Sequence, residues 1–121
     1  MLEKLRKLSS RFVGDIYENK AKTFLQSQGL QFIEKNFTCK LGEIDLIFKE
    51  QELLIFVEVK YRQSGQYGAS SEMVDYGKLL RLKKTALCYL VTNGYVEQST
   101  PCRFDVIAIQ GANIEWIKQV I

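Results

Sequence analysis

The sequence predicts one α/β domain, built on a mixed central sheet of about five strands flanked by helices. Two long segments, at about 10–28 and 73–91, carry apolar residues at helical spacing. Five shorter segments are rich in β-branched and aromatic residues, as strands are. The predicted order is α-β-β-β-α-β-β. A chain of 121 residues suits a single domain over 1–121 and can bury a core of its own.

The first predicted helix spans about 10–28. Ser9 and Ser10 are residue types that cap helix N-termini, and Gly29 is a residue type that ends helices. The apolar residues that recur between them at helical spacing are Val13, Ile16, Tyr17, Ala21, Phe24 and Leu25. We therefore expect one face of this helix to pack against the sheet.

Three strands follow in close succession, over 31–39, 43–48 and 53–61. The second alternates between two kinds of side chain, which is typical of a strand with two different faces. The third is the most hydrophobic stretch of the chain, and this favours a central position in the sheet. The polar segment 50–52 joins the second and third strands, so we expect these two to form a hairpin.

A loop, a second helix and two further strands complete the predicted fold. The loop, 63–71, holds two glycines and three serines and is long enough to be functional. The second helix, 73–91, has an apolar stripe and is followed by Gly94. Strands are predicted at 102–110 and 114–121, with a turn at 111–113 between them.

Charge and composition restrict the functions to consider. The chain has 17 Lys and Arg residues against 14 Asp and Glu residues, and this mild excess permits binding to a polyanion without indicating it. Basic residues cluster within 4–11 and within 78–84, where they either contact phosphates or simply face solvent. There is no histidine, so any catalysis must rely on carboxylates, Lys, Tyr, Cys or a metal held by oxygen ligands.

The cysteines and the hydropathy pattern predict a cytoplasmic protein. Cys39, Cys88 and Cys102 lack the spacing of a zinc site, and we expect them to be buried thiols in a reducing compartment. No apolar run reaches membrane-spanning length, and the first twelve residues lack the apolar stretch of a signal peptide. We therefore expect no membrane partner.

Two charged residues, Glu58 and Lys60, interrupt the most hydrophobic strand. Strand alternation places both side chains on the same face. Burying charged groups costs free energy unless they are paired or bind a metal. A structural ion pair between Glu58 and Lys60 is one interpretation of this pattern, and a metal site is the other.

The neighbouring strand supplies another acid, Asp45, inside a second apolar run. If the hairpin turns at Gln51 and Glu52, Asp45 lies directly across from Glu58 and on the same face. Two opposed carboxylates repel each other unless a positive group lies between them. A divalent cation meets that need, and Lys60 can meet part of it.

These residue types fit the hydrolysis of a phosphodiester bond with Mg²⁺ or Mn²⁺ as cofactor. Mg²⁺ prefers oxygen ligands, and Asp45, Glu58 and the backbone carbonyl of Val59 can provide three. A metal at such a site polarises the phosphate and activates water. Lys60 would orient or deprotonate that water, or neutralise the phosphate. The candidate catalytic residues are therefore Asp45, Glu58 and Lys60.

The pattern of Asp45 followed by Glu58-Val59-Lys60 resembles the motif of the PD-(D/E)XK nuclease superfamily, which includes type II restriction enzymes and archaeal Holliday junction resolvases. The chain resembles more closely the uncharacterised bacterial YraN family, over about 14–107. The most specific segments are GEIDLI at 42–47 and FVEVKYR at 56–62. The supporting positions are Gly14, Glu18, Ala21, Leu25, Gly29, Asn36, Lys78, Ala86 and Arg103-Phe104-Asp105-Val106. This resemblance implies a restriction-endonuclease-like core.

The resemblance also implies a further acidic metal ligand. In the superfamily an acid on the first helix often completes the metal site, and the matching residue here is Glu18. Read alone, Glu18 is an ordinary helix carboxylate of the kind that usually faces solvent. The chain departs from the family at Tyr17, where a glycine is usual, and at Thr38, where a basic residue is usual. Ile44 stands where the superfamily has a proline.

Three functions are compatible with these observations. The first is a metal-dependent endonuclease for DNA processing, acting on branched or single-stranded intermediates. Its predicted phosphate contacts are Arg62, Lys78, Arg81, Lys83 and Lys84. The second is a nucleic-acid-binding module with a nuclease-like fold and no turnover. The third is an interaction domain, although such a domain has no chemical reason to keep buried acids together. Cutting two strands with so small a domain would favour a homodimer.

Overall fold

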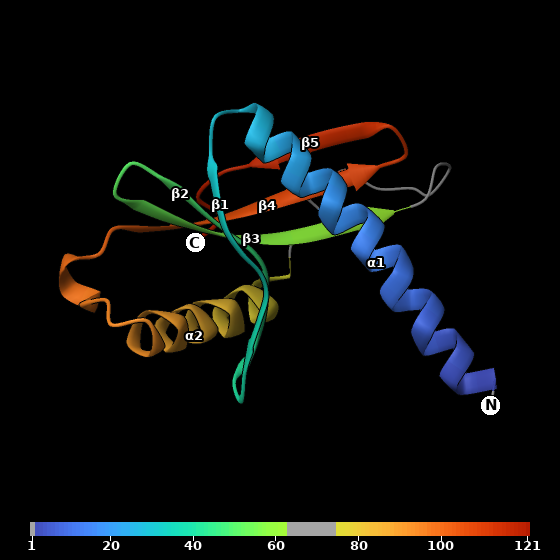
Figure 1. Ribbon diagram of the computed structural model, residues 1–121, viewed down its shortest axis with the longest axis horizontal. Coiled ribbons are helices and arrows are strands. Elements are labelled where there is room, and N and C mark those ends of the chain that lie inside the picture. The colour runs from blue at the N-terminus through green and yellow to red at the C-terminus, as the bar shows by residue number, and fades with distance from the viewer. Residues whose placement is uncertain (1, 63–74) are drawn as a thin grey trace.

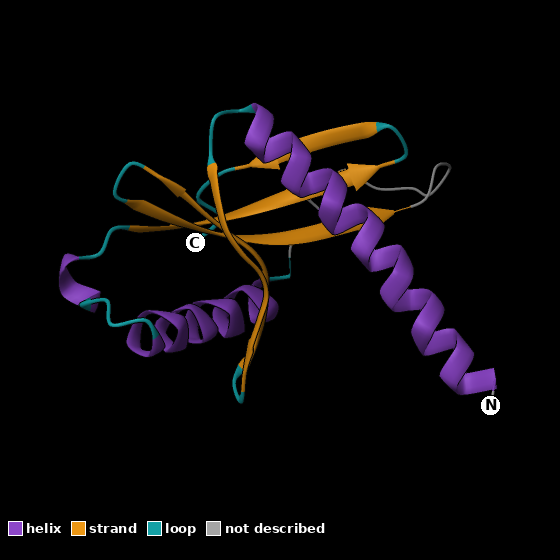
Figure 2. Cartoon of the chain, in the orientation of Figure 1, coloured by secondary structure: helices purple, strands orange, loops and turns teal. Residues whose placement is uncertain are grey.

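The computed structural model, described for residues 2–62 and 75–121, has a five-stranded sheet with a helix against each face (Figures 1 and 2). The elements are α1 (Leu2–Ser27), β1 (Gln31–Cys39), β2 (Gly42–Glu50), β3 (Leu53–Arg62), α2 (Tyr76–Thr92), a 3₁₀ turn η2 (Glu97–Ser99), β4 (Cys102–Gln110) and β5 (Asn113–Ile117). This order of helices and strands confirms the predicted α/β fold.

The sheet is mixed, and its strands lie side by side in the order β1-β2-β3-β4-β5. Only β3 and β4 run parallel, and α2 lies in the connection between them, because parallel neighbours need a crossover. In the β2–β3 hairpin Leu46 lies opposite Val57 and Glu50 lies opposite Leu53. This is the register predicted from a turn at Gln51 and Glu52.

Two apolar clusters, one on each face of the sheet, hold the helices in place. On one face, Ala21 and Leu25 of α1 pack with Phe48 and Val57 of the sheet. On the other face, Leu82 and Tyr89 of α2 pack with Ile44 and Phe56 of the sheet, among others. Because successive strand residues point to opposite faces, a single hydrophobic strand such as β3 supplies both clusters.

Helix α1 begins at Leu2, so the predicted start near residue 10 is wrong. Ser9 and Ser10 lie inside the helix and do not cap it. The residues before them are mostly Leu, Lys, Arg and Glu, which have high helix propensity and extend the helix past the serines. Figure 1 shows this N-terminal half projecting beyond the sheet. Leu2, Leu5 and Phe12 are exposed in this half, with Phe12 68% accessible.

Four other expectations need correction or lie outside the described residues. Strand β5 ends at Ile117 and not at 121, because the backbone adopts φ 56° at Gln119 and Val120 N–H then donates to Phe104. Helix α2 begins at Tyr76 after the N-cap Asp75. Residues 73 and 74 and the predicted loop 63–71 lie outside the described residues. The three cysteines, expected to be buried, are partly exposed.

No helix within 2–62 and 75–121 is long and apolar enough to cross a membrane.

Candidate metal centre

Asp45 lies where β2 and β3 separate. The paired residues of this hairpin run from Glu50 and Leu53 to Leu46 and Val57, so Asp45 comes just beyond the last pair. Its carboxylate oxygen Oδ2 accepts a hydrogen bond from the backbone N–H of Val59 at 2.8 Å. The side chain of Asp45 is thereby turned toward β3 and held at the mouth of the gap between the two strands.

Two further carboxylates lie beside Asp45. One oxygen of each of Glu18, Glu43 and Asp45 lies within 4.8 Å of the others. Glu18 comes from α1 and Glu43 from β2, two residues before Asp45, so the cluster joins the first helix to the first hairpin. We call Glu18, Glu43 and Asp45 the acidic cluster. Three acids in this space repel one another, which indicates a site for a positive ion.

Asn36 connects two members of the acidic cluster. In the amide orientation that satisfies both partners, its Nδ2 donates to Glu18 Oε1 at 3.1 Å and to Glu43 Oε1 at 3.0 Å. Asn36 holds a left-handed backbone conformation with φ 57°, which asparagine tolerates better than most residues. The amide thus supplies the two carboxylates with hydrogen-bond donors but no charge.

Among the described ion pairs, Lys35 is the cation that lies close to Glu18, the member of the acidic cluster on α1. Its Nζ lies 3.0 Å from Asp15 and 3.9 Å from Glu18. It also donates to Asn19 at 3.3 Å. These contacts link β1 to α1. Asp15 lies closer to Lys35 than Glu18 does and is its main ion-pair partner.

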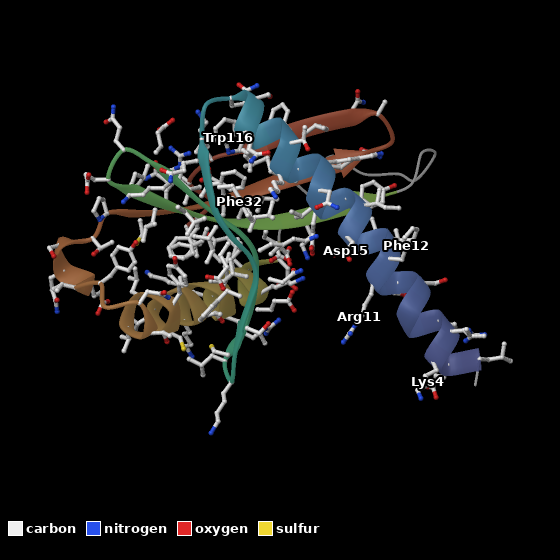
Figure 3. The ribbon with its side chains drawn as sticks, in the orientation of Figure 1. Lys4, Arg11, Phe12, Asp15, Phe32 and Trp116 are labelled. Atoms are coloured by element: carbon white, nitrogen blue, oxygen red, sulfur yellow. The ribbon has the colours of Figure 1, made fainter. Side chains whose placement is uncertain are left out.

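A polar cleft of about 380 Å³ opens over the acidic cluster. Its lining includes Glu18, Glu43, Asn36, Asp15 and Arg11. Figure 3 shows Arg11 and Asp15 extending from α1 on the side of the hairpin, whereas Phe12 points away from it. The projecting half of α1 therefore brings positive charge to the edge of the acidic cleft.

Glu58 lies on the α2 side of the sheet, in contact with two lysines. Its side chain is only 7% exposed, and its Oε1 lies 2.7 Å from Lys78 Nζ and 3.5 Å from Lys60 Nζ. A smaller cleft of about 110 Å³, lined by Glu43, Glu58, Lys78 and Arg81 among others, reaches these groups. Glu43 lines both clefts, so the lysine–Glu58 group and the acidic cluster share a border.

Burial and charge shift the pKa values of Asp45 and Glu18 upward. The pKa of Asp45 is raised from 3.8 to about 8, first by burial and then by the charge of Glu58, although the Val59 hydrogen bond opposes the change. Burial also raises the pKa of Glu18, while Lys35 lowers it in part. Without a metal, Asp45 is therefore protonated at neutral pH.

The two lysines shift in opposite directions. Burial lowers the pKa of Lys60, and the neighbouring Lys78 lowers it further against the attraction of Glu58. Burial also acts to lower the pKa of Lys78, but its hydrogen bonds to Glu58 and Lys60 and the charge of Glu58 outweigh this and raise it. Lys78 is thus the partner that keeps its charge, and Lys60 is the one that gives up a proton more easily.

Gly42 lets the β1–β2 hairpin approach α2. A Cβ atom at Gly42 would lie 2.9 Å from Thr85 Oγ1, and the glycine holds φ +151°. Thr85 is buried and its hydroxyl donates to the Arg81 carbonyl, which leaves it little room to move. The close approach sets the position of Glu43, the next residue, between the two clefts.

The structure brings together most of the residues predicted for the site. Asp45, Glu58, Lys60 and Glu18 converge where β2 and β3 separate, and Val59 contributes its backbone N–H to Asp45. Their catalytic and metal-binding roles remain predictions, as does the use of the Val59 carbonyl as a ligand.

The predicted phosphate contacts are spread more widely. Lys78 and Arg81 line the cleft at Glu58, whereas Lys83 lines a different cavity with Glu97 and Phe104. Lys84 is exposed, and Arg62 at the end of β3 is half-buried. Only the first two therefore share a cleft with the candidate site.

Sequence analysis missed Glu43 and Asn36 as members of the site. Glu43 precedes Asp45 by two residues, a spacing that puts both on one face of a strand, so the alternation pattern carried a usable signal. Asn36 lies across from Asp45, because its neighbours in β1 pair with the neighbours of Asp45: Lys35 with Leu46 and Phe37 with Ile44. That pairing depends on how β1 and β2 align in the folded sheet, and no local sequence pattern predicts it.

The donor atoms of the acidic cluster fit a hard divalent cation. All three ligands are carboxylate oxygens, which Mg²⁺ and Mn²⁺ prefer, and among the described residues no sulfur atom joins them. When all three are ionised, their charge also exceeds what Lys35 compensates, because Asn36 donates hydrogen bonds but carries no charge. Both observations support a magnesium or manganese site held by Glu18, Glu43 and Asp45.

Comparison with known proteins places the chain among bacterial relatives of similar length. Residues 17–109 match the sequence profile of the family described as uncharacterised protein family UPF0102. The chain is 52% identical to the UPF0102 protein of Vibrio vulnificus strain YJ016 over 115 residues, which cover 93% of this chain and 94% of the relative. It is 47% identical to that of Aliivibrio salmonicida over 118 residues, 96% of each chain. It is 41% identical to that of Photobacterium profundum over 116 residues, 94% and 93% of the two chains.

Proposed function

The chain belongs to the UPF0102 (YraN) family, which is PD-(D/E)XK-like, and we propose that it is a metal-dependent endonuclease that hydrolyses phosphodiester bonds in DNA. The observation that carries the proposal is the acidic cluster at the separation of β2 and β3, bordered by Glu58 and two lysines. Such a set holds a cation at one side and offers a titratable amine at the other, and phosphodiester hydrolysis uses both.

In this proposal the acidic cluster binds the metal and Glu58 positions the lysines. Glu18, Glu43 and Asp45 would hold Mg²⁺ or Mn²⁺, with Asn36 keeping two of the carboxylates in place. When bound, the ion would polarise the scissile phosphate and activate water. Glu58 pairs with Lys78, which lines the smaller cleft, and with Lys60, and both ammonium groups would act on the phosphate or the attacking water.

The lysines have distinct proposed roles because their pKa values move in opposite directions. Lys60, whose pKa burial lowers, can accept a proton from the attacking water more readily than an ordinary lysine. Lys78, whose pKa is raised, keeps its charge and is suited to neutralise the phosphate. Asp45 must lose its own proton before it can act as a ligand, so metal binding and activity should both rise with pH.

The substrate would lie across the two adjoining clefts. Arg11 lines one cleft and Arg81 the other, and both can contact phosphates on either side of the scissile bond. Lys4 extends from the projecting half of α1 on the same side as Arg11 (Figure 3). A branched or single-stranded DNA fits this proposal, and a homodimer that cuts two strands remains a further prediction.

One observation favours a second function, a nucleic-acid-binding module without turnover. Lys78 lies 2.7 Å from Glu58, so this buried acid has a cationic partner even without a metal. In that reading the lysines and arginines would bind phosphates, and the acidic cluster would have no catalytic use.

A cleavage assay separates these functions. We would incubate the protein with duplex, single-stranded and branched DNA, with Mg²⁺, Mn²⁺ or EDTA, and compare Asp45→Asn, Glu58→Gln and Glu50→Gln. Glu50 is an exposed acid at the far end of β2 and serves as the matched control. The nuclease proposal expects metal-dependent cleavage by the wild type and Glu50→Gln, and a loss of about 100-fold or more in the other two variants.

The binding assay on the same DNA panel completes the test. DNA binding without cleavage under every metal condition would support the module. If the protein neither binds nor cleaves any DNA of the panel, both functions are contradicted.

A further inference from the structure

Two of the three cysteines meet where the β1–β2 hairpin packs against α2. Cys39 is the last residue of β1, and Cys88 lies in the fourth turn of α2. They are 49 positions apart in the chain, yet Gly42, the strand partner of Cys39, lies against Thr85, three residues before Cys88, and the two thiols interact with each other. Both residues are partly exposed, so a small oxidant can reach them.

The packing around this pair is fixed by larger groups. Phe37 and Ile44 of the hairpin pack with Leu82 and Tyr89 of α2, and Gly42 approaches Thr85 closely. The two elements that carry these thiols are therefore held together by the fold, which is what a disulfide between them requires.

The backbone prepares Cys39 to react first. The N–H of Leu41 donates to Cys39 Sγ at 3.4 Å. Burial acts to raise the pKa of Cys39, but the hydrogen bonds from Leu41, Cys88 and Gly42 outweigh this and lower it. The pKa of Cys88 is raised, chiefly by its hydrogen bond to Cys39. Since the thiolate is the reactive form, Cys39 is the nucleophile of the pair and Cys88 is the partner that resolves it.

We propose that Cys39 and Cys88 are a thiol oxidation site that forms a reversible disulfide with hydrogen peroxide as the oxidant. The Cys39 thiolate attacks one peroxide oxygen, the O–O bond breaks, and hydroxide leaves and takes up a proton to become water. The sulfenic acid on Cys39 is then attacked by the Cys88 sulfur, which loses its proton, and the S–OH bond breaks to release a second water. Two thiols are oxidised and one peroxide is reduced.

The disulfide would fasten the hairpin to α2 beside the candidate metal centre. Glu43 follows Cys39 by four residues, and Lys78 lies on the same helix as Cys88. Oxidation therefore fixes the two elements that border the smaller cleft relative to each other. This inference does not rest on the proposed nuclease function, because disulfide formation is measured on the protein alone.

The test uses purified full-length protein treated with hydrogen peroxide and then with a thiol-blocking reagent. Intact mass and peptide mapping should show the loss of two hydrogens and a linked peptide pair containing Cys39 and Cys88, with Cys102 still free to be blocked. Dithiothreitol should restore both thiols. The midpoint of thermal unfolding should rise by roughly 10 °C in the oxidised protein, because the bond closes a long loop.

Two variants give the controls. Cys102→Ser should keep both the disulfide and the rise in unfolding temperature, and Cys88→Ser should lose both and accumulate a sulfenic or more oxidised Cys39. The inference would be overturned if peroxide left Cys39 and Cys88 unlinked in the wild type. It would equally be overturned if Cys102 formed disulfides with either residue as readily as they do with each other.

Discussion

The substitution Asp45→Asn should stabilise the metal-free protein at neutral pH, although it removes a central residue of the site. Asp45 is held among carboxylates with one backbone N–H as its hydrogen-bond donor, and its pKa is raised to about 8. An asparagine has the same shape, keeps an oxygen to accept the Val59 N–H, and carries no charge. The variant therefore removes the repulsion and leaves the packing unchanged.

The magnitude follows from the difference between the folded and unfolded pKa values. Below pH 4 the carboxyl group of Asp45 is protonated in both states and costs nothing. Between about pH 4 and 8 the unfolded chain loses this proton while the folded chain keeps it, so stability falls as pH rises, by about 1.4 kcal/mol per pH unit at most. From pH 5 to pH 7 the contribution of this residue falls by about 3 kcal/mol. The raised pKa of Glu18 acts in the same direction.

The assay is urea denaturation followed by far-UV circular dichroism, in EDTA, at several pH values from 5 to 8. We expect the free energy of unfolding of the wild type to fall with pH more steeply than that of Asp45→Asn. The two proteins should differ most near pH 8. Parallel pH dependences, or a variant less stable than the wild type at pH 7, would refute the reasoning about the acidic cluster.

Asp105 provides a matched control of the opposite sign. It is a second buried aspartate, with no exposed surface, but its carboxylate accepts hydrogen bonds from Arg103, Trp116 Nε1 and the Gln119 N–H. Asp105→Asn leaves the partly buried guanidinium of Arg103 without its charged partner. We expect this variant to lose about 3 kcal/mol at pH 7. The same chemical change should thus stabilise one site and destabilise the other.

The remaining predictions concern metal, turnover and DNA. Millimolar Mg²⁺ or Mn²⁺ should raise the melting temperature of the wild type, and the rise should be larger at pH 8 than at pH 6 because the ion displaces the proton of Asp45. Calorimetry in two buffers of different ionisation enthalpy should detect the proton that is released. The variant Asp45→Asn should show neither effect. Lys60→Ala should still bind the metal but cleave DNA about 100-fold more slowly in single-turnover assays, and equal loss of both properties would contradict its assigned role. Arg11→Ala should weaken DNA binding and reduce its dependence on salt concentration, whereas Lys84→Ala, outside both clefts, should change binding less; equal effects would indicate a diffuse basic surface.

The hairpin geometry of the site could be predicted because it depends on local rules. The polar turn at Gln51 and Glu52 sets the register of β2 and β3, and Asp45 lies just beyond the last pair of that register, so the expected direct pairing with Glu58 is not among the pairs. The alternation of a strand then places Lys60 with Glu58. These inferences need only a turn position and a period of two.

The parts that could not be predicted depend on how separate elements meet. Lys78 contacts Glu58 because the crossover between β3 and β4 lays α2 along the sheet, and no sequence spacing encodes that distance. Asn36 reaches the acidic cluster through a left-handed residue inside β1, an irregularity without a clear sequence signature. The meeting of Cys39 and Cys88 has the same origin.

The helix boundary failed for a different reason. The serines at 9 and 10 are good caps, but cap preferences amount to only about 1 kcal/mol and do not end a helix whose neighbours favour continuing it. The correction matters for function, because the added turns carry Lys4 beyond the sheet on the same side as Arg11, which lines the cleft (Figure 3).

The central claim is that the acidic cluster holds a divalent ion that enables cleavage of DNA. The most direct measurement is the single-turnover cleavage rate of a branched DNA as a function of Mn²⁺ concentration, for the wild type and Glu43→Gln. The account predicts a rate that rises and saturates with Mn²⁺ in the wild type, falls to background in EDTA, and in Glu43→Gln requires at least about tenfold more metal. Cleavage that persists in EDTA, or DNA that binds without being cut at any metal concentration, would contradict it.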